Sequence, residues 1–360
     1  MKAQSLYLHI PFCDHLCSYC DFPKVLTSVY DRKEYLQALF REIDSFHIER
    51  GSLKTIYVGG GTPSALALPE LEFLLRGLLD RFGKVEEFTI ECNPESLSKE
   101  KARLFSRFLV NRVSLGVESV SPRLLALYQR HHTLDHVRDA VSYLRAYNIG
   151  NINLDFIYGL GDGTKEIDED IDFALSLEPT HLSFYSLQIE DGTLLKRRKV
   201  TVEEDHLREE YDYLVARLEK EGYARYEVSN FARKGWESRH NLVYWHDQEY
   251  YGCGLGASGF LFPKRYKNTL SMPSYLRGEN AREIEVVDKE SHKIEYLMLH
   301  LRLVEGFSLD DYQEVFQEDF LKTHQKGISS VSDMVEIVGG RFRIKKEDLY
   351  VMDHVLLALI

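Results

Sequence analysis

The sequence lacks any long run of apolar residues. No stretch approaches the ~18 apolar residues that a membrane-spanning helix requires. The N-terminal segment "MKAQSLYLHIPF" has only a short apolar stretch, which His9 and Pro11 interrupt, and it has no small-residue cleavage site of a secretory signal. We therefore predict a cytoplasmic protein without a transmembrane segment, in which thiols stay reduced.

A surplus of positive charge is also missing. The 45 Lys and Arg residues are outnumbered by 57 Asp and Glu residues, which gives a formal net charge of −12. Nucleic-acid binding depends on clustered cations that displace counterions from the phosphate backbone. The dense cationic run "KRRK" at 196–199 is typical of a solvated loop or helix face. We therefore expect no nucleic-acid partner.

The remaining composition is that of a folded globular protein. Apolar residues make up 44% and charged residues 28% of the chain, which excludes the disordered and fibrous classes. A length of 360 residues suits one large α/β domain with a smaller domain appended to it.

Helices and strands alternate from residue 31 to about residue 230. The periodicity predicts a first strand in "LYLHIPF", helices at 31–50, 68–82, 98–108, 134–149, 166–177 and 201–222, and after these helices strands at 54–61, 86–94, 111–119, 151–160, 181–190 and 224–231. Strands separated by single helices cannot pair as hairpins, so they form a parallel sheet with crossover helices. About six such units predict a full or partial barrel, in which ligands gather at the carboxyl ends of the strands.

The pattern changes after about residue 285. We predict helices at 291–303 and 309–320, a hairpin at 335–344 and a last helix towards Ile360, which together are winged-helix-like. This region is not notably basic, so a lid or packing role is expected for it. The predicted division is a core barrel at 1–230, a connecting segment at 231–284 and a C-terminal domain at 285–360.

Polar residues and glycines follow several predicted strands. Gly59, Gly60 and Gly61 follow "TIYV", Glu91 ends "FTI", Glu118 follows "VSLGV" and Asp155 ends "INL". Packing of a core explains the apolar residues of each strand, but it does not explain polar residues repeated at the same rim. We expect a ligand site at this rim.

Three cysteines follow the first strand in the spacing Cys-x3-Cys-x2-Cys. One reading is a zinc site built from Cys13, Cys17 and Cys20 with His9 or His15. A second is a redox thiol pair, Cys17 and Cys20. The third, which the spacing favours, is a [4Fe–4S] cluster whose fourth iron has no protein ligand.

The cysteine motif resembles the signature of the radical S-adenosylmethionine (SAM) superfamily. The aromatic Tyr19 before Cys20 belongs to this resemblance, and "GGGTPS" at 59–64 offers backbone without side chains for close approach to a ligand. In that superfamily the amino and carboxylate groups of SAM chelate the open iron. Reduction of the cluster then cleaves SAM to a 5′-deoxyadenosyl radical, and the resemblance implies a partial (β/α)6 TIM-type barrel.

Motifs along nearly the whole chain resemble the oxygen-independent coproporphyrinogen III oxidase (dehydrogenase) family. These motifs are "LYLHIPFC", "GGGTPS", "LGVES", "NLDFIYGL" and "YEVSNFA". Where the dehydrogenases commonly have Gln after "GV", this chain has Glu118, which accepts hydrogen bonds but lacks the amide donor. The resemblance implies that SAM contacts Tyr7, Tyr19, Gly60, Gly61, Thr62, Glu91, Glu118, Arg130 and Asp155.

Phe22 distinguishes two branches of this family. The dehydrogenases extend the motif to a fourth cysteine at this position, and Phe22 can neither ligate a metal nor carry thiol chemistry. This departure resembles the HemW-type haem chaperones. In "RHNLVYW", His240 matches their haem-binding motif, together with Asn241, Tyr244 and Trp245. Without the resemblance, a buried, hydrogen-bonded His240 among ordinary packed aromatic residues is the alternative.

These resemblances predict a haem chaperone rather than an enzyme with coproporphyrinogen dehydrogenase activity. It would bind a [4Fe–4S] cluster, SAM and haem, and would pass haem to haem-accepting proteins. A flavodoxin or ferredoxin would supply an electron if SAM is cleaved. The alternatives are a coproporphyrinogen III dehydrogenase of porphyrin biosynthesis and another radical SAM enzyme. We expect Cys92 and Cys253 to be packed small residues, because "GCGLGASG" lacks the strand and helix of a dinucleotide fingerprint.

Overall fold

A nine-stranded sheet forms the centre of the computed structural model, which describes residues 2–161, 163–279 and 281–360. Its strand order is β11-β1-β4-β5-β6-β7-β8-β10-β9. The six long strands pair in parallel, each with the next, as the sequence predicts. They are β1 (Ser5–Ile10), β4 (Thr55–Gly60), β5 (Glu87–Cys92), β6 (Arg112–Glu118), β7 (Asn151–Tyr158) and β8 (His181–Ser186).

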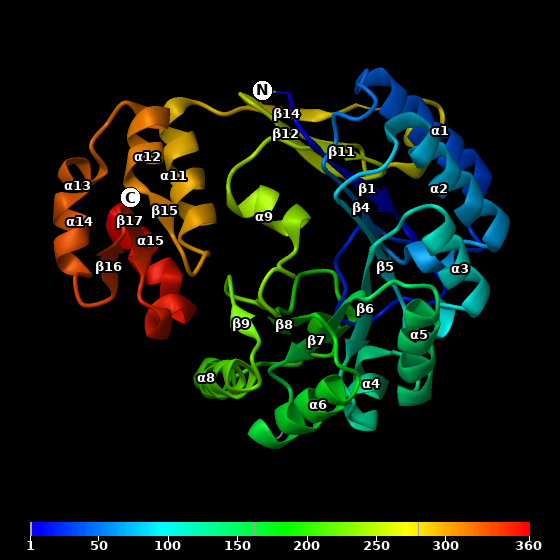
Figure 1. Cartoon of the computed structure of the whole chain (residues 1–360), viewed down its shortest axis with the longest axis horizontal. Coiled ribbons are helices and arrows are strands. Elements are labelled where there is room, and N and C mark those ends of the chain that lie inside the picture. The colour runs from blue at the N-terminus through cyan, green and yellow to red at the C-terminus, as the bar shows by residue number, and fades with distance from the viewer. Residues whose placement is uncertain (1, 162, 280) are drawn as a thin grey trace.

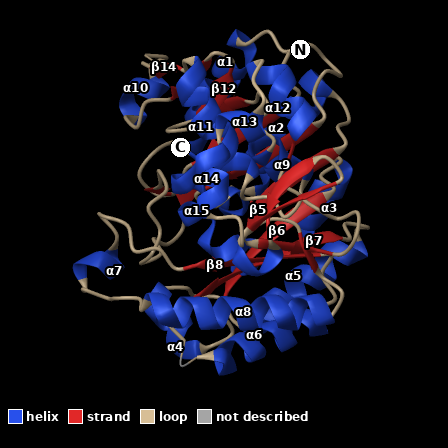
Figure 2. Ribbon diagram, turned by 90° about the vertical axis from the view of Figure 1, so that its left-hand side faces the viewer, coloured by secondary structure: helices blue, strands red, loops and turns tan. Residues whose placement is uncertain are grey.

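Helices cover the outer side of this curved sheet (Figure 1), and α6, α8 and α4 lie along one edge of it (Figure 2). Side chains cap several of these helices; Asp31, for example, accepts from the backbone N–H groups of Lys33 and Glu34. The predicted partial (β/α)6 barrel is therefore confirmed. The helices of this part are α1 (Arg32–Ser45), α2 (Leu68–Phe82), α3 (Lys99–Arg107), α4 (Pro122–Tyr128), α5 (Leu134–Ala146), α6 (Thr164–Ser176), α7 (Leu194–Arg197) and α8 (Glu204–Lys220).

Each long strand alternates between apolar and polar side chains. In β6, for example, Val113, Leu115 and Val117 are buried in the hydrophobic core, whereas Arg112 and Ser114 line the inner cavity. Side chains of a strand point alternately to its two faces, so the apolar face packs against the helices and the polar face lines the inside. Branched apolar residues usually fill the inside of such a barrel. The polar inner face therefore makes this interior a candidate binding site.

One predicted parallel strand is wrong. Residues 224–231 form two short antiparallel strands, β9 (Ala224–Arg225) and β10 (Asn230–Ala232), and β10 pairs antiparallel with β8. Between them the chain turns around Glu227, which is fully buried and accepts from the backbone N–H of Ser229 at 3.1 Å and from Arg302 Nε at 2.7 Å. The buried carboxylate holds the reversal, which the alternating pattern of the sequence does not reveal.

The parallel sheet continues beyond the predicted core barrel. The strand β11 (Tyr251–Cys253) pairs in parallel with β1 at the opposite edge. This strand has only three residues and lies beside a glycine-rich segment, so the sequence shows no alternation of polar and apolar residues that would predict it. Between β10 and β11 lies α9 (Arg239–Trp245), which is on the inner side of the sheet (Figure 1). The domain boundaries at residues 230 and 284 stay predictions.

Short strands surround the main sheet. A parallel pair, β2 (Phe12–Cys13) and β3 (Val25–Leu26), closes the cysteine loop. A three-stranded sheet contains β12 (Ser258–Leu261), β13 (Lys264–Lys267) and β14 (Glu283–Val286), with α10 (Met272–Leu276) between β13 and β14. This sheet leads the chain towards its C-terminal part.

The C-terminal part has its own aromatic core, which includes Tyr296, Phe307 and Phe342. The predicted hairpin is confirmed, but the helix predicted at 309–320 ends early because Gln317 adopts a left-handed conformation, with φ at 57°. The elements are α11 (Lys289–His300), β15 (Phe307–Ser308), α12 (Leu309–Phe316), α13 (Phe320–Thr323), α14 (Gln325–Ser330), β16 (Val335–Val338), β17 (Arg341–Ile344) and α15 (Met352–Leu359). Among the described helices, none is long and apolar enough to cross a membrane.

Candidate functional site

The cysteine loop sits over the carboxyl end of the barrel. Its start and end are fixed by the short strands, where Val25 N–H donates to Pro11 O at 2.8 Å and Thr27 N–H donates to Cys13 O at 3.0 Å. Its middle is fixed on α4, because Ser18 Oγ donates to Leu127 O at 2.6 Å. The loop is therefore held at both ends and in the middle, and this positions its thiols.

A cavity of about 510 Å³ opens beneath this loop. All three cysteines line it, and so do most of the residues predicted to contact SAM. These are Tyr19, Gly60, Gly61, Thr62, Glu91, Glu118, Arg130 and Asp155, whereas the predicted Tyr7 and His240 are not among the lining residues. Segments that are far apart in the sequence thus contribute to one site, and its residues stay predicted ligands.

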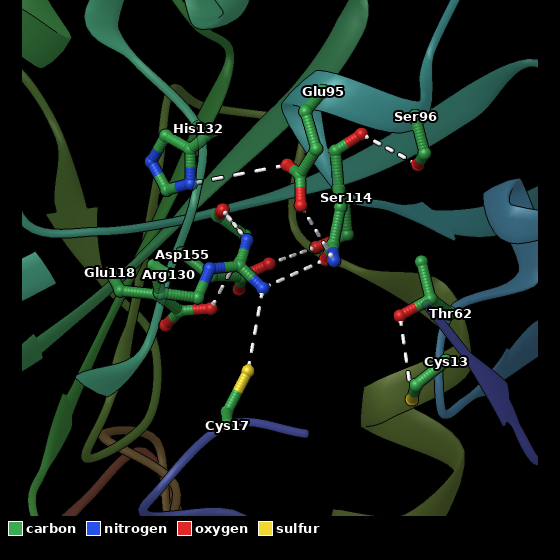
Figure 3. Close-up of polar contacts among 12 residues, drawn as sticks. Cys13, Cys17, Thr62, Glu95, Ser96, Ser114, Glu118, Arg130, His132 and Asp155 are labelled. Carbon is green, nitrogen blue, oxygen red and sulfur yellow. Dashed lines mark hydrogen bonds and ion pairs between the residues drawn. The ribbon is translucent and has the colours of Figure 1, made fainter. Parts of the chain in front are cut away.

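The surroundings of the thiols suit an iron–sulfur cluster. Thr62 Oγ1 lies 3.6 Å from Cys13 Sγ, and Arg130 Nη1 lies 3.8 Å from Cys17 Sγ, so both can donate to ligated sulfur (Figure 3). A Cβ on Gly61 would come within 2.9 Å of Cys13 Sγ, which explains why glycine stands there. Burial raises the pKa of Cys13 to about 11, and a bound metal ion would offset this cost of forming the thiolate.

A single-ion zinc site receives no support from the geometry. Among the described residues, no three His, Cys, Asp or Glu side chains form a group that could hold one metal ion. His9 is engaged elsewhere, because Tyr7 Oη lies 3.0 Å from its Nδ1 and its Nε2 lies 2.7 Å from Pro23 O. The ring of His15 lies against that of His131. In a [4Fe–4S] cluster each cysteine ligates a different iron, so the three thiolates do not have to meet at a single metal ion.

Glu91 is held at the rim by two donors. Tyr57 Oη donates to its Oε1 at 2.7 Å, and the backbone N–H of Gly60 donates to its Oε2 at 3.0 Å. Gly60 has a φ of 118°, and a Cβ there would meet the ring of His9 at 2.7 Å. Burial raises the pKa of Glu91 to about 7. A cationic group of a ligand would favour its charged form.

Arg130 and Glu118 form a buried pair at the rim. Arg130 Nη2 lies 3.9 Å from Glu118 Oε1 (Figure 3). The guanidinium also donates to Asn93 Oδ1 at 3.0 Å and to Gly116 O at 2.5 Å. Burial raises the pKa of Glu118, and the charge of Arg130 acts against this shift. The pair offers a ligand both a cation and a hydrogen-bond acceptor.

Asp155 lies in the middle of β7 rather than at the end of a strand, which corrects the position predicted from the sequence. Ser114 Oγ donates to its Oδ2 at 2.6 Å and Asn153 Nδ2 donates to its Oδ1 at 2.8 Å. Burial raises its pKa. Asp155 nevertheless lines the cavity, so the inner face of β7 contributes to the site below the end of the strand.

His240 is fully buried on α9, at the opposite end of the strands from the cysteines. Its Nδ1 lies 2.7 Å from Thr55 Oγ1 and its Nε2 lies 2.8 Å from Tyr244 Oη, so both ring nitrogens have hydrogen-bond partners. Burial lowers its pKa to about 3, so the imidazole is neutral. In this conformation neither ring nitrogen is free to ligate a haem iron. Ligation through Nε2 would require the hydroxyl of Tyr244 to move away.

The sequence analysis missed several cavity residues. Asn93 follows β5 directly and orients Arg130, and Tyr57 orients Glu91. Polar residues deeper in the barrel also line the cavity, namely Arg112, Ser114, Asn153 and Ser183. Their signal was the strict alternation of polar and apolar residues within the strands, which is typical of a sheet with one polar face. Cys92 and Cys253 are buried, as expected.

Replacement of Glu91 by glutamine tests its shifted pKa. A carboxyl whose pKa is higher in the folded than in the unfolded protein contributes stability below the unfolded pKa, and this contribution is lost as pH rises through the folded value. Between pH 4.5 and 7 the wild type should therefore lose roughly 2–3 kcal/mol of unfolding free energy relative to Glu91→Gln, at 1.36 kcal/mol per pKa unit. Denaturant unfolding of both proteins across this range measures the difference. Parallel curves would contradict a raised pKa of Glu91.

A family model and curated proteins with similar sequences indicate the same family for this chain. Residues 7–174 match the family model of the radical SAM superfamily. A protein from Lactococcus lactis named "Heme chaperone HemW" is 39% identical, over 96% of this chain and 94% of its own length. Proteins of the same name from Bacillus subtilis and Escherichia coli are 35% and 34% identical, over 87% and 84% of this chain and 87% and 83% of their own lengths.

A solved structure shares the fold over almost the whole chain. The coproporphyrinogen III oxidase HemN from Escherichia coli, described as a radical SAM enzyme, has a TM-score of 0.83 and covers 99% of this chain and 90% of its own. Its sequence identity is 18%, so this likeness concerns the fold alone. Together with the curated relatives, these findings show that the chain belongs to the HemW family of the radical SAM superfamily.

Proposed function

We propose that this protein is a haem chaperone that binds a [4Fe–4S] cluster, SAM and haem and transfers haem to acceptor proteins. The observation that carries this proposal is the 39% identity to a named haem chaperone over 96% of the chain. Phe22 supports it, because it stands where the related dehydrogenases have a fourth cysteine, and the residue is 61% exposed beside the cavity. We also propose that the protein works in the cytoplasm.

The cysteine loop and the rim of the cavity would hold the first two cofactors. Cys13, Cys17 and Cys20 would ligate the cluster, which would supply an open iron for SAM and an electron when reduced. Glu91 would accept from a cationic or hydroxyl group of SAM, and Arg130 would bind a carboxylate. A flavodoxin or ferredoxin is the electron donor that we propose if SAM is cleaved.

Haem binding at His240 would require α9 to change its hydrogen bonds. Tyr244 Oη lies 2.8 Å from His240 Nε2, the atom that a haem iron would take. Tyr244→Phe removes this competing hydroxyl but keeps the ring, so it is expected to bind haem at least as tightly as the wild type. His240→Gln keeps hydrogen bonding at this position but removes the imidazole, so it should lose the absorption bands of histidine-ligated haem.

Haem titration of the anaerobically reconstituted full chain measures these outcomes. Unchanged spectra and affinity in His240→Gln would remove His240 from the haem site without removing haem binding. The same preparation, supplied with SAM and a reductant, should not decarboxylate coproporphyrinogen III. Robust decarboxylation would overturn the chaperone function in favour of the dehydrogenase. A wild type that binds no haem would overturn it as well.

A further inference from the structure

A buried arginine without a charge partner lies deep in the cavity. Arg112 is the first residue of β6, and it is 1% exposed. Its Nε is buried without a hydrogen-bond partner, and no ion pair joins its guanidinium to a described carboxylate. Arg112 nevertheless lines the cavity. A buried charge of this kind is costly unless a partner compensates it.

Two carboxyl groups that interact electrostatically with Arg112 have other hydrogen-bond partners. Glu91 accepts from Tyr57 and Gly60, and Asp155 accepts from Ser114 and Asn153. Burial raises the pKa of both carboxyls, and the charge of Arg112 only partly offsets this shift. Both carboxyls are hydrogen-bonded to these other partners, and neither forms an ion pair with the guanidinium.

The inner face just above Arg112 offers further hydrogen-bonding groups. Asn153 Nδ2 bonds to Ser114 Oγ at 2.7 Å and to Ser183 Oγ at 2.9 Å, and all three residues line the cavity. In the strand register Arg112 lies beside Thr89 of β5, and Ser114 lies beside Glu91. Arg112 therefore lies one inward-facing position, about 7 Å, below Glu91, a predicted SAM contact.

The helix α9 connects this level to the haem motif. Asn241 lines the same cavity, and the ring of its neighbour His240 lies 5.1 Å from that of Tyr57, another lining residue. The charge of Arg112 also contributes to lowering the pKa of His240, which places the two groups within electrostatic reach.

We propose that the floor of this cavity is a carboxylate-binding subsite, in which Arg112 holds a propionate group of haem. This inference rests on the proposed function, since haem is the ligand that carries the propionate. The guanidinium would form a charge-assisted, two-point contact with the carboxylate, and the hydroxyl and amide groups of Ser114, Asn153 and Ser183 would surround it. An anionic ligand would thereby compensate a charge that the folded chain leaves unpaired.

The test compares haem with haem dimethyl ester, in which both propionates are blocked. The reconstituted wild type should bind the ester about 10- to 100-fold more weakly, as expected for loss of a charge-assisted contact. Arg112→Met should bind haem as weakly as the ester, and Arg112→Lys should recover part of the difference. The matched control is Arg225→Met, which removes a buried arginine that bonds Tyr211 Oη and Lys346 O outside the cavity. It should discriminate like the wild type.

Stability separates a ligand-binding role from a structural one. Without ligands, Arg112→Met should melt at or above the wild-type temperature, because it removes an uncompensated charge. Arg225→Met should melt lower, because it also removes the hydrogen bonds to Tyr211 and Lys346. A comparable drop in both variants would overturn the proposal. A wild type that binds haem and its ester equally would overturn the subsite alone, and a wild type that binds no haem would overturn the proposed function as well.

A third arm identifies the source of the carboxylate. SAM and decarboxylated SAM are titrated into the wild type and Arg112→Met. We expect Arg112→Met to keep the SAM affinity of the wild type within about threefold. If Arg112→Met instead binds SAM as weakly as decarboxylated SAM and still discriminates haem from its ester, the carboxylate belongs to SAM and the proposal fails.

Discussion

Cys17→Ala is expected to lose the cluster altogether. Its iron content should fall from about four atoms per chain to near zero, and the broad four-iron absorbance should vanish, because a cluster held by three thiolates has no spare protein ligand. SAM affinity should fall at least tenfold, since the open iron that chelates SAM is lost with the cluster. Iron and sulfide analysis, absorbance spectra and SAM titration of the reconstituted protein measure these changes.

Cys253→Ala is the matched control for this experiment. Cys253 is fully buried on β11 and does not line the cavity, so its removal should cost about 1 kcal/mol of stability and leave the cluster intact. Four irons in Cys17→Ala would contradict the three-cysteine ligand set. One zinc ion per wild-type chain, lost in Cys17→Ala, would favour the zinc site that the sequence left open.

Arg130→Met is expected to have the second largest effect. Arg130 and Glu118 are both buried, and removal of one partner from a buried pair typically costs about 3–5 kcal/mol, because the other charge is left uncompensated. Arg130→Met also removes the hydrogen bonds to Asn93 and Gly116. SAM affinity should fall about 10- to 100-fold if Arg130 binds its carboxylate. Denaturant unfolding and SAM titration provide the two measurements.

The pH dependence identifies Glu118 as the cause of this instability. Without Arg130, burial raises the pKa of Glu118 further, so the loss of stability should be larger at pH 8 than at pH 6. The double variant Glu118→Gln, Arg130→Met removes the unpaired carboxylate and should recover much of the stability at pH 8 but none of the SAM affinity. Equal losses at both pH values would show that Glu118 is not the source.

The predicted haem ligand, His240, has both ring nitrogens engaged in hydrogen bonds. The alternative reading of His240, as a buried and hydrogen-bonded histidine, describes its present environment. The family relationship nevertheless supports haem as the cargo, because the curated relatives are named haem chaperones. A movement of α9 that frees Nε2 would reconcile both observations, and the Tyr244→Phe variant tests it directly.

The sequence predicted the parallel strands and their crossover helices because each strand and helix carries its own periodicity. It failed at 224–231, where a buried carboxylate reverses the chain, and at β11, which is three residues long. Both features depend on partners distant in the sequence: Arg302 bonds Glu227, and β1 pairs with β11. Local pattern carries no information on such partners.

The candidate site shows the same division. The sequence by itself identified the three cysteines by their spacing and several polar rim residues by their places in the strands, because both are local properties, and the family resemblance supplied the meaning of Phe22. Only the tertiary structure decided which nitrogens of His240 are occupied, that Asn93 orients Arg130, and that Arg112 stands unpaired at the cavity floor. These facts depend on how distant strands bring side chains together, and burial then sets the energetic cost of each unpaired charge.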